Sequence, residues 1–168
     1  MSREQTKVTV EVTKALVLVR DDGSAVAIPQ ALEQIRDDSV QVSRQLFRGD
    51  VGNTTKGVLG EIVTGLEELL AALEQAQREQ QQEQGNNPSG GRPPQPGEQP
   101  LVDKLAELKM IRSLRMRINS RTQRFSQLLD EGVERAVEPE LIHALDRLAE
   151  RQRLIQQAAH DIVSGRTE

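Results

Sequence analysis

The sequence lacks several residue types on which common sites and cores depend. Its 168 residues include no Cys, Trp or Tyr, and Phe47 and Phe125 are its only aromatics. The absence of Cys excludes disulfide frameworks, thiolate metal sites and cysteine nucleophiles. Because aromatic side chains bury the most apolar surface per residue, their scarcity argues against a thick globular core.

Long hydrophobic segments are also missing. The longest apolar run, Ala15 to Val19, is far shorter than the roughly 20 residues of a membrane span. No basic stretch followed by a long apolar one opens the chain, so no signal peptide is visible. We therefore predict no transmembrane span and, by default, a cytoplasmic location, or the cell envelope if the chain is a fragment.

Helix-forming residues dominate what is present. Ala, Glu, Lys, Leu, Arg and Gln are abundant, as in long helices and coiled coils. Residues 85–100 break this composition, because they are rich in Gly, Pro and Gln and contain no aliphatic residue. We predict a disordered linker there, between an N-terminal helical region (1–84) and a C-terminal helical hairpin (101–168).

The apolar spacing before the linker predicts two helices and one ambiguous segment. Residues 1–23 fit either a strand or a helix, but a lone two-stranded hairpin is marginal in water, so a helix ending near Gly23 is favoured. Pro29 suits the first turn of a helix over 29–48, and Gly49 suits its stop. A third segment, 55–84, has a wide apolar stripe, which is typical of a helix with more than one neighbour.

The spacing after the linker predicts helices over 101–131 and 138–164. The fold class is therefore all-α, with helical hairpins or an elongated helical bundle and coiled-coil-like seams. The residues expected to carry helix–helix contacts are Leu66, Leu69, Leu73, Leu105, Leu108, Leu114, Leu141, Leu145, Leu148 and Ile155.

Opposite charges flank the linker. Residues 61–83 carry six acids and one Arg, whereas 103–124 carry seven basic residues and two acids. We call these two charged segments the arms. If the arms pair antiparallel, the residue numbers of two paired residues sum to about 185. The expected pairs are Glu61 with Arg124, Glu68 with Arg117 and Glu74 with Arg112. Pairing within one chain is favoured, and pairing between two chains or no pairing are the alternatives.

The sequence offers little for catalysis or metal binding. His143 and His160 stand outside any metal-spacing motif, and Asp37 and Asp38 are expected to face water on a helix. No nucleophile motif, paired-carboxylate setting or glycine-rich cofactor loop stands out. We therefore predict no cofactor, no metal and no enzymatic activity.

Three segments, Ile28–Asp38, Glu61–Leu69 and Pro100–Leu114, resemble an uncharacterised family of predicted helical proteins from planctomycete-type bacteria. The resemblance extends from about Asp22 onward, implies an all-helical fold and carries over no site. Together these features predict a non-catalytic structural or scaffolding protein that binds partner helices, including a second copy of itself. The alternative is a basic-helix binder of nucleic acid or an anionic membrane surface through residues 104–124; the net charge of −4 disfavours nucleic acid.

Overall fold

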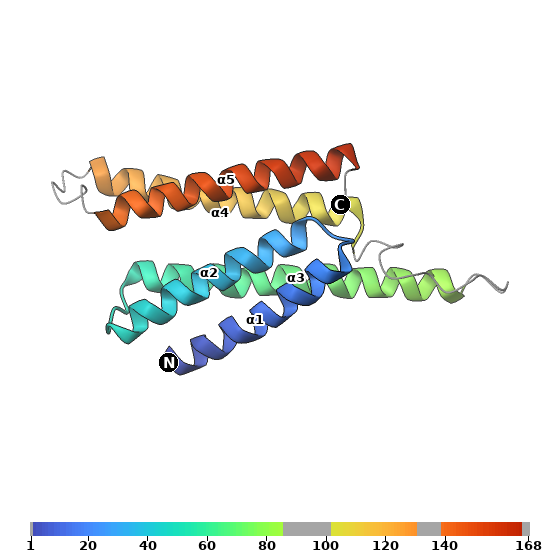
Figure 1. Ribbon diagram of the computed structural model, residues 1–168, viewed down its shortest axis with the longest axis horizontal. Helices are drawn as coiled ribbons and strands as arrows, with labels where there is room; N and C mark the ends of the chain where they lie inside the picture. Colours follow the sequence, from blue (N-terminus) through green and yellow to red (C-terminus); the bar gives the residue numbers. More distant parts are fainter. Residues whose placement is uncertain (1, 86–101, 131–138, 166–168) are drawn as a thin grey trace.

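The computed structural model describes residues 2–85, 102–130 and 139–165. Its helices are α1 (Ser2–Asp22), α2 (Ala27–Phe47), α3 (Asn53–Gly85), α4 (Lys104–Asp130) and α5 (Pro139–Ser164). Successive helices run in opposite directions along one long axis, and the α4–α5 pair lies beside the layer formed by α1, α2 and α3 (Figure 1). The described residues contain no strand, and the predicted all-α fold is confirmed.

Helix α1 resolves the ambiguity of the Val-rich opening segment. Val12 and Leu16 are buried in the core, and Val8 and Val19 pack against it. Helix α1 packs mainly against α2. The burial of its apolar face in this contact outweighs the strand preference of its β-branched residues. Gly23 follows the helix with a φ of +68°, a conformation that glycine adopts without steric cost.

Helix α2 lies at the centre of the bundle, because it contacts all four other helices. Ile28, Ile35 and Val42 are at most 1% exposed. The helix begins at Ala27, two residues before the predicted start at Pro29, which falls in the first turn where its missing N–H costs nothing. It ends at Phe47, and the predicted stop, Gly49, has a φ of +79°.

A buried carboxylate from α4 explains where α2 begins. Glu107 Oε1 accepts hydrogen bonds from the backbone N–H groups of Val26 (2.6 Å) and Ala27 (3.0 Å). The first N–H groups of a helix have no partner within it, and their end of the helix attracts negative charge. Glu107 therefore caps α2 from 80 residues away in the sequence.

Three predicted boundaries are corrected. Helix α4 begins at Lys104 rather than residue 101, because Asp103 caps it by accepting a hydrogen bond from the N–H of Ala106 at 2.5 Å. Helix α3 begins at Asn53 rather than residue 55, following a turn in which Asp50 accepts from the N–H of Gly52. Gly85, assigned to the linker, is the last residue of α3. The rest of the predicted linker lies outside the described residues.

Candidate functional site

Helix α3 carries two apolar stripes rather than one. An inner stripe consists of buried Val58, Ile62, Gly65 and Leu69 with half-buried Ala72 and Ala76. An outer stripe consists of half-buried Leu59 and exposed Val63, Leu66, Leu70 and Leu73. Both stripes alternate steps of four and three residues, the spacing that keeps side chains on one face of a helix. The stripes therefore lie side by side on adjoining faces of α3.

The inner stripe approaches α2 closely because it contains a glycine. A Cβ on Gly65 would lie 3.2 Å from Cδ1 of Ile35 and 3.0 Å from Nη1 of Arg117. The missing side chain therefore makes room for a core residue of α2 and an arginine of α4. Gly60 of the same helix differs from Gly65, because a Cβ on Gly60 would meet no atom within 4 Å.

The outer stripe is exposed over about three helical turns. The exposed fractions are 53% for Val63, 36% for Leu66, 59% for Leu70 and 40% for Leu73. Glu67 and Glu74 directly follow Leu66 and Leu73 and lie seven residues apart, so they border the same edge of this stripe. Both are exposed. The outer stripe is thus an apolar surface with an acidic border.

Three of the leucines predicted to carry helix–helix contacts are exposed in the bundle. Leu66 and Leu73 of α3 and Leu105 of α4, which is 60% exposed, face water. The reason is the position of α2, which supplies the apolar surface that both α3 and α4 cover.

The other predicted contact residues lie closer to the core. Leu69, Leu114, Leu148 and Ile155 are buried, and Leu108 and Leu145 are half-buried. The Leu141 side chain lies outside the described part of the chain. These residues contribute mainly to the intramolecular core of the bundle.

Charged residues join α3 to α4 in the antiparallel arrangement. Arg117 contacts Glu68, and Arg124 contacts Glu61, so the structure brings together two of the three predicted pairs. Ser113 adds hydrogen bonds of 2.8 Å to both carboxylate oxygens of Glu68.

The third predicted pair is not formed. Glu74 lies 3.5 Å from Arg78 on its own helix, and the described residues show no contact between Glu74 and Arg112. Charge pairing across the two arms is therefore confined to the part of α3 that α4 covers.

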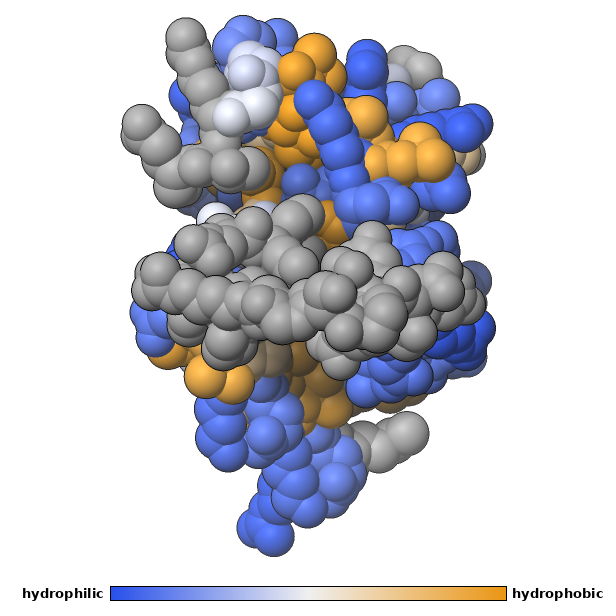
Figure 2. Space-filling model, turned by 90° about the vertical axis from the view of Figure 1, so that its right-hand side faces the viewer, coloured by the Kyte–Doolittle hydropathy of each residue, from blue (hydrophilic) through white to orange (hydrophobic). Residues whose placement is uncertain are grey.

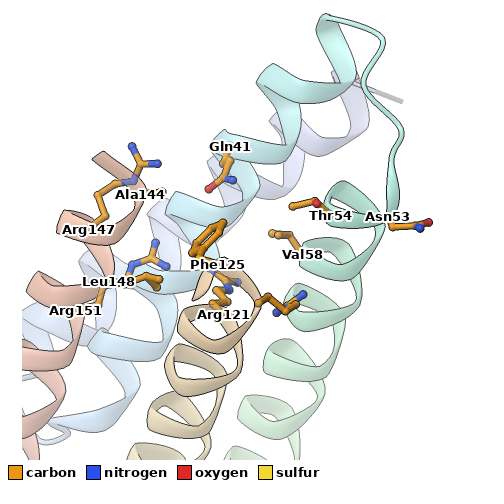
Figure 3. A pocket seen from close by; sticks show the side chains of 11 residues that line it. Gln41, Asn53, Thr54, Val58, Arg121, Phe125, Ala144, Arg147, Leu148 and Arg151 are labelled. Atoms are coloured by element: carbon orange, nitrogen blue, oxygen red, sulfur yellow. The ribbon is translucent and has the colours of Figure 1, made fainter. Parts of the chain in front are cut away.

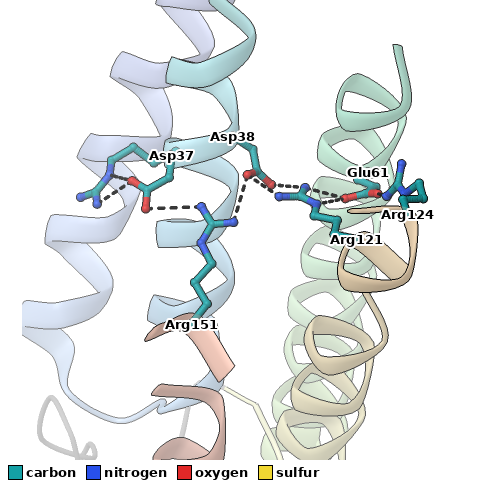
Figure 4. A network of polar contacts seen from close by, with 7 residues as sticks. Asp37, Asp38, Glu61, Arg121, Arg124 and Arg151 are labelled. Atoms are coloured by element: carbon teal, nitrogen blue, oxygen red, sulfur yellow. Dashed lines mark hydrogen bonds and ion pairs between the residues drawn. The ribbon is translucent and has the colours of Figure 1, made fainter. Parts of the chain in front are cut away.

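A polar network joins four helices at the centre of the bundle (Figure 4). Arg121 of α4 donates to both carboxylate oxygens of Asp38 of α2, at 2.8 and 2.6 Å, and to Glu61 of α3 at 2.6 Å. Arg151 of α5 donates to Asp38 at 3.1 Å. The side chains of Asp38 and Arg121 are only 3% and 9% exposed.

The expectation for Asp37 and Asp38 is therefore half wrong. Asp37 is 48% exposed, but Asp38 is buried, and it contacts the guanidinium groups of Arg121 from α4 and Arg151 from α5. Burial alone lowers the pKa of Arg121, but its hydrogen bonds with Asp38 and Glu61 and their negative charges raise that pKa above the ordinary range. Arg121 is thus cationic at physiological pH.

The same network reduces the basic surface predicted on α4. Arg117, Arg121 and Arg124 are paired with acids of α2 and α3. Lys104 donates to the backbone carbonyl of Val163 on α5 at 3.2 Å. What remains exposed on α4 includes Lys109, Arg112 and Arg115.

The described residues show no metal or membrane feature. Across 2–85, 102–130 and 139–165, no three His, Asp or Glu side chains converge as metal ligands. No helix within these ranges has the length and apolar character needed to cross a bilayer.

Comparison with family models, curated proteins and solved structures finds no match to this chain. The resemblance to a planctomycete-type family therefore stays a prediction. The role of the protein has to be argued from its own surfaces.

Proposed function

We propose that this chain is a non-catalytic helical scaffold that binds a partner helix along the outer stripe of α3. The observation that carries the proposal is the exposure of Val63, Leu66, Leu70 and Leu73 in a regular helical row. Single exposed apolar residues are common on protein surfaces, whereas a contiguous row is typical of an interaction surface. In the end view, apolar side chains reach the surface both above and below the grey residues, among mostly hydrophilic ones (Figure 2).

The border of the stripe indicates the chemistry of the partner. Glu67, and Glu74 with Arg78 3.5 Å from it, would lie beside the edge of any helix seated on the stripe and leave that edge net negative. Charges at this position govern partner choice and orientation. A helix with an apolar seam and Lys or Arg beside it satisfies both features. A second α3 would bring like charges together along this edge. We therefore propose that the partner is a basic amphipathic helix rather than a second copy of this chain.

The basic-helix alternative loses support from the geometry of α4. Three of its arginines already neutralise acids of α2 and α3. Apart from Lys104, the other exposed basic residues of α4 form a short row without an aromatic side chain: Lys109, Arg112 and Arg115. Single-strand binders usually combine a longer basic groove with aromatic platforms.

Titration of a dye-labelled Leu/Lys heptad peptide, followed by fluorescence anisotropy, tests the proposal. The native chain should bind this peptide more tightly than a matched Leu/Glu peptide. The double variant Leu66→Gln/Leu70→Gln should weaken binding about tenfold or more, since two apolar contacts are lost. Met116→Gln on α4 is the matched control, because Met116 is 58% exposed outside the stripe, and it should leave binding unchanged.

Two results would contradict the proposal. One is equal binding of the Lys and Glu peptides, or equal binding by the native and stripe variants. The other is a native dimer, detected by light scattering, that Leu66→Gln/Leu70→Gln converts to monomer. In that case a second copy, and not a basic helix, covers the stripe.

A further inference from the structure

A pocket opens where α2, α3, α4 and α5 meet, beside the polar network (Figure 3). Its volume is about 200 Å³. An apolar cavity of about 150 Å³ holds one benzene molecule, so this pocket has room for one ring and a small substituent. The outer stripe of α3 contributes none of its lining residues, so the pocket is a separate feature of the molecule.

The pocket has an apolar part to its lining. This part consists of Val58 from α3, Phe125 from α4 and Leu148 from α5. Phe125 lies near the middle of the close-up, between Gln41 and Arg121 (Figure 3). Phe125 is one of only two aromatics in the chain and is half-buried, so it offers a ring face or edge to a second ring.

The lining of the pocket also carries an excess of positive charge. Four arginines line it: Arg121, Arg124, Arg147 and Arg151. The carboxylates that contact them are Asp37, Asp38 and Glu61. Asp37 also contacts Arg36, so the arginines around the pocket outnumber these carboxylates and leave a positive surplus.

The surplus is centred on Arg147. Arg121, Arg124 and Arg151 each contact a carboxylate of the network, whereas Arg147 forms no ion pair within the described residues. Arg147 is exposed and lies at the pocket, so an anion can reach it. Gln41 and Thr54 add neutral hydrogen-bonding groups to the lining.

We propose that this pocket binds a small aromatic monocarboxylate. The ring would lie against Val58, Phe125 and Leu148, and the carboxylate would take the guanidinium of Arg147. A guanidinium matches a carboxylate with two parallel hydrogen bonds. A single carboxylate matches Arg147, the one lining arginine without a carboxylate partner within the described residues, whereas a nucleotide is too large for the volume.

Benzoate is the probe that tests the site, by ligand-observed NMR with chemical-shift mapping on the full chain. Benzoate should bind with a Kd in about the millimolar range or tighter, and shifts should cluster around Phe125 and Leu148. Benzamide, which has the same shape without the charge, and acetate, which lacks the ring, should each bind about tenfold more weakly.

Variants assign the roles of the two halves of the pocket. Arg147→Gln should weaken benzoate binding about tenfold and leave benzamide binding unchanged, because only the charged contact is lost. Arg115→Gln, an exposed arginine of α4 outside the pocket, is the matched control and should bind benzoate like the native chain. Circular dichroism and thermal unfolding of each variant show whether the fold is intact.

Three outcomes would overturn the assignment. They are no benzoate binding, equal binding of benzoate and benzamide, or no effect of Arg147→Gln in a folded variant. None of them bears on the outer stripe of α3, so the pocket and the proposed scaffold function fail or stand separately.

Discussion

Helices α2 and α3 have similar apolar spacing but opposite surroundings. Helix α2 contacts every other helix and buries even a carboxylate, Asp38, whereas α3 contacts mainly α2 and α4 and leaves a second apolar stripe in water. The comparison shows that a 3-4 apolar rhythm specifies a helix and its faces but not the number of neighbours. The apolar surface that α3 leaves uncovered is the basis of the proposed function.

The largest expected effect is on the buried charges of α2. Asp38→Ala leaves the guanidinium groups of Arg121 and Arg151 without their shared buried partner, which should lower the free energy of unfolding by about 3–5 kcal/mol. Asp37→Asn next to it removes only half-exposed contacts and should cost less than about 1 kcal/mol. Urea unfolding of both variants measures the difference; equal, small losses would mean that Asp38 is not buried in a network.

The next effect concerns the capping of α2 from α4. Glu107→Ala removes the acceptor for two backbone N–H groups and should lower the free energy of unfolding by about 1–3 kcal/mol. Glu107→Gln keeps an oxygen acceptor and should recover part of that loss. Thermal unfolding, together with hydrogen exchange at Val26 and Ala27, tests the assignment. Native exchange rates at both amides in Glu107→Ala would contradict it.

Two glycines of α3 should respond in opposite directions to the same substitution. Gly65→Ala places a methyl group against Ile35 and Arg117 and should destabilise the chain by about 1–3 kcal/mol. Gly60→Ala meets open space in a helix and should stabilise it by about 0.5–1 kcal/mol. Chemical denaturation of both variants gives the two signs directly. A shared sign would show that α3 does not approach α2 as described.

The smallest effect on stability is expected at the outer stripe. Leu66→Gln/Leu70→Gln should change the free energy of unfolding by no more than about 0.5 kcal/mol per site, because surface substitutions away from special features have small effects. A loss of several kcal/mol in the urea experiment would show that these leucines are part of the core. Ile35→Ala in α2 is the contrasting buried truncation, with an expected loss of about 2–5 kcal/mol.

The sequence predicts the helices well because their signals are local. Apolar spacing, glycine stops and the central composition break give the helical segments to within a few residues. The charge balance of the two arms also predicts the antiparallel pairing of Glu68 with Arg117 and of Glu61 with Arg124. Each of these inferences needs only the sequence pattern and simple helix geometry.

Other features depend on which helix covers which, and local patterns do not contain that information. Asp38 meets Arg121 across 83 residues, and Glu107 meets Val26 across 81. Nothing beside either carboxylate marks it as buried. Leu66 and Leu69 fit the same helical rhythm, so only the position of α2 determines that Leu69 is covered and Leu66 is exposed.

Hydrogen exchange measured by mass spectrometry, with and without the Leu/Lys peptide, tests most directly whether the outer stripe of α3 is a binding surface. We expect slower exchange confined to the segment around residues 59–73. Protection of α4 and α5 alone, or none at a saturating peptide concentration, would contradict it.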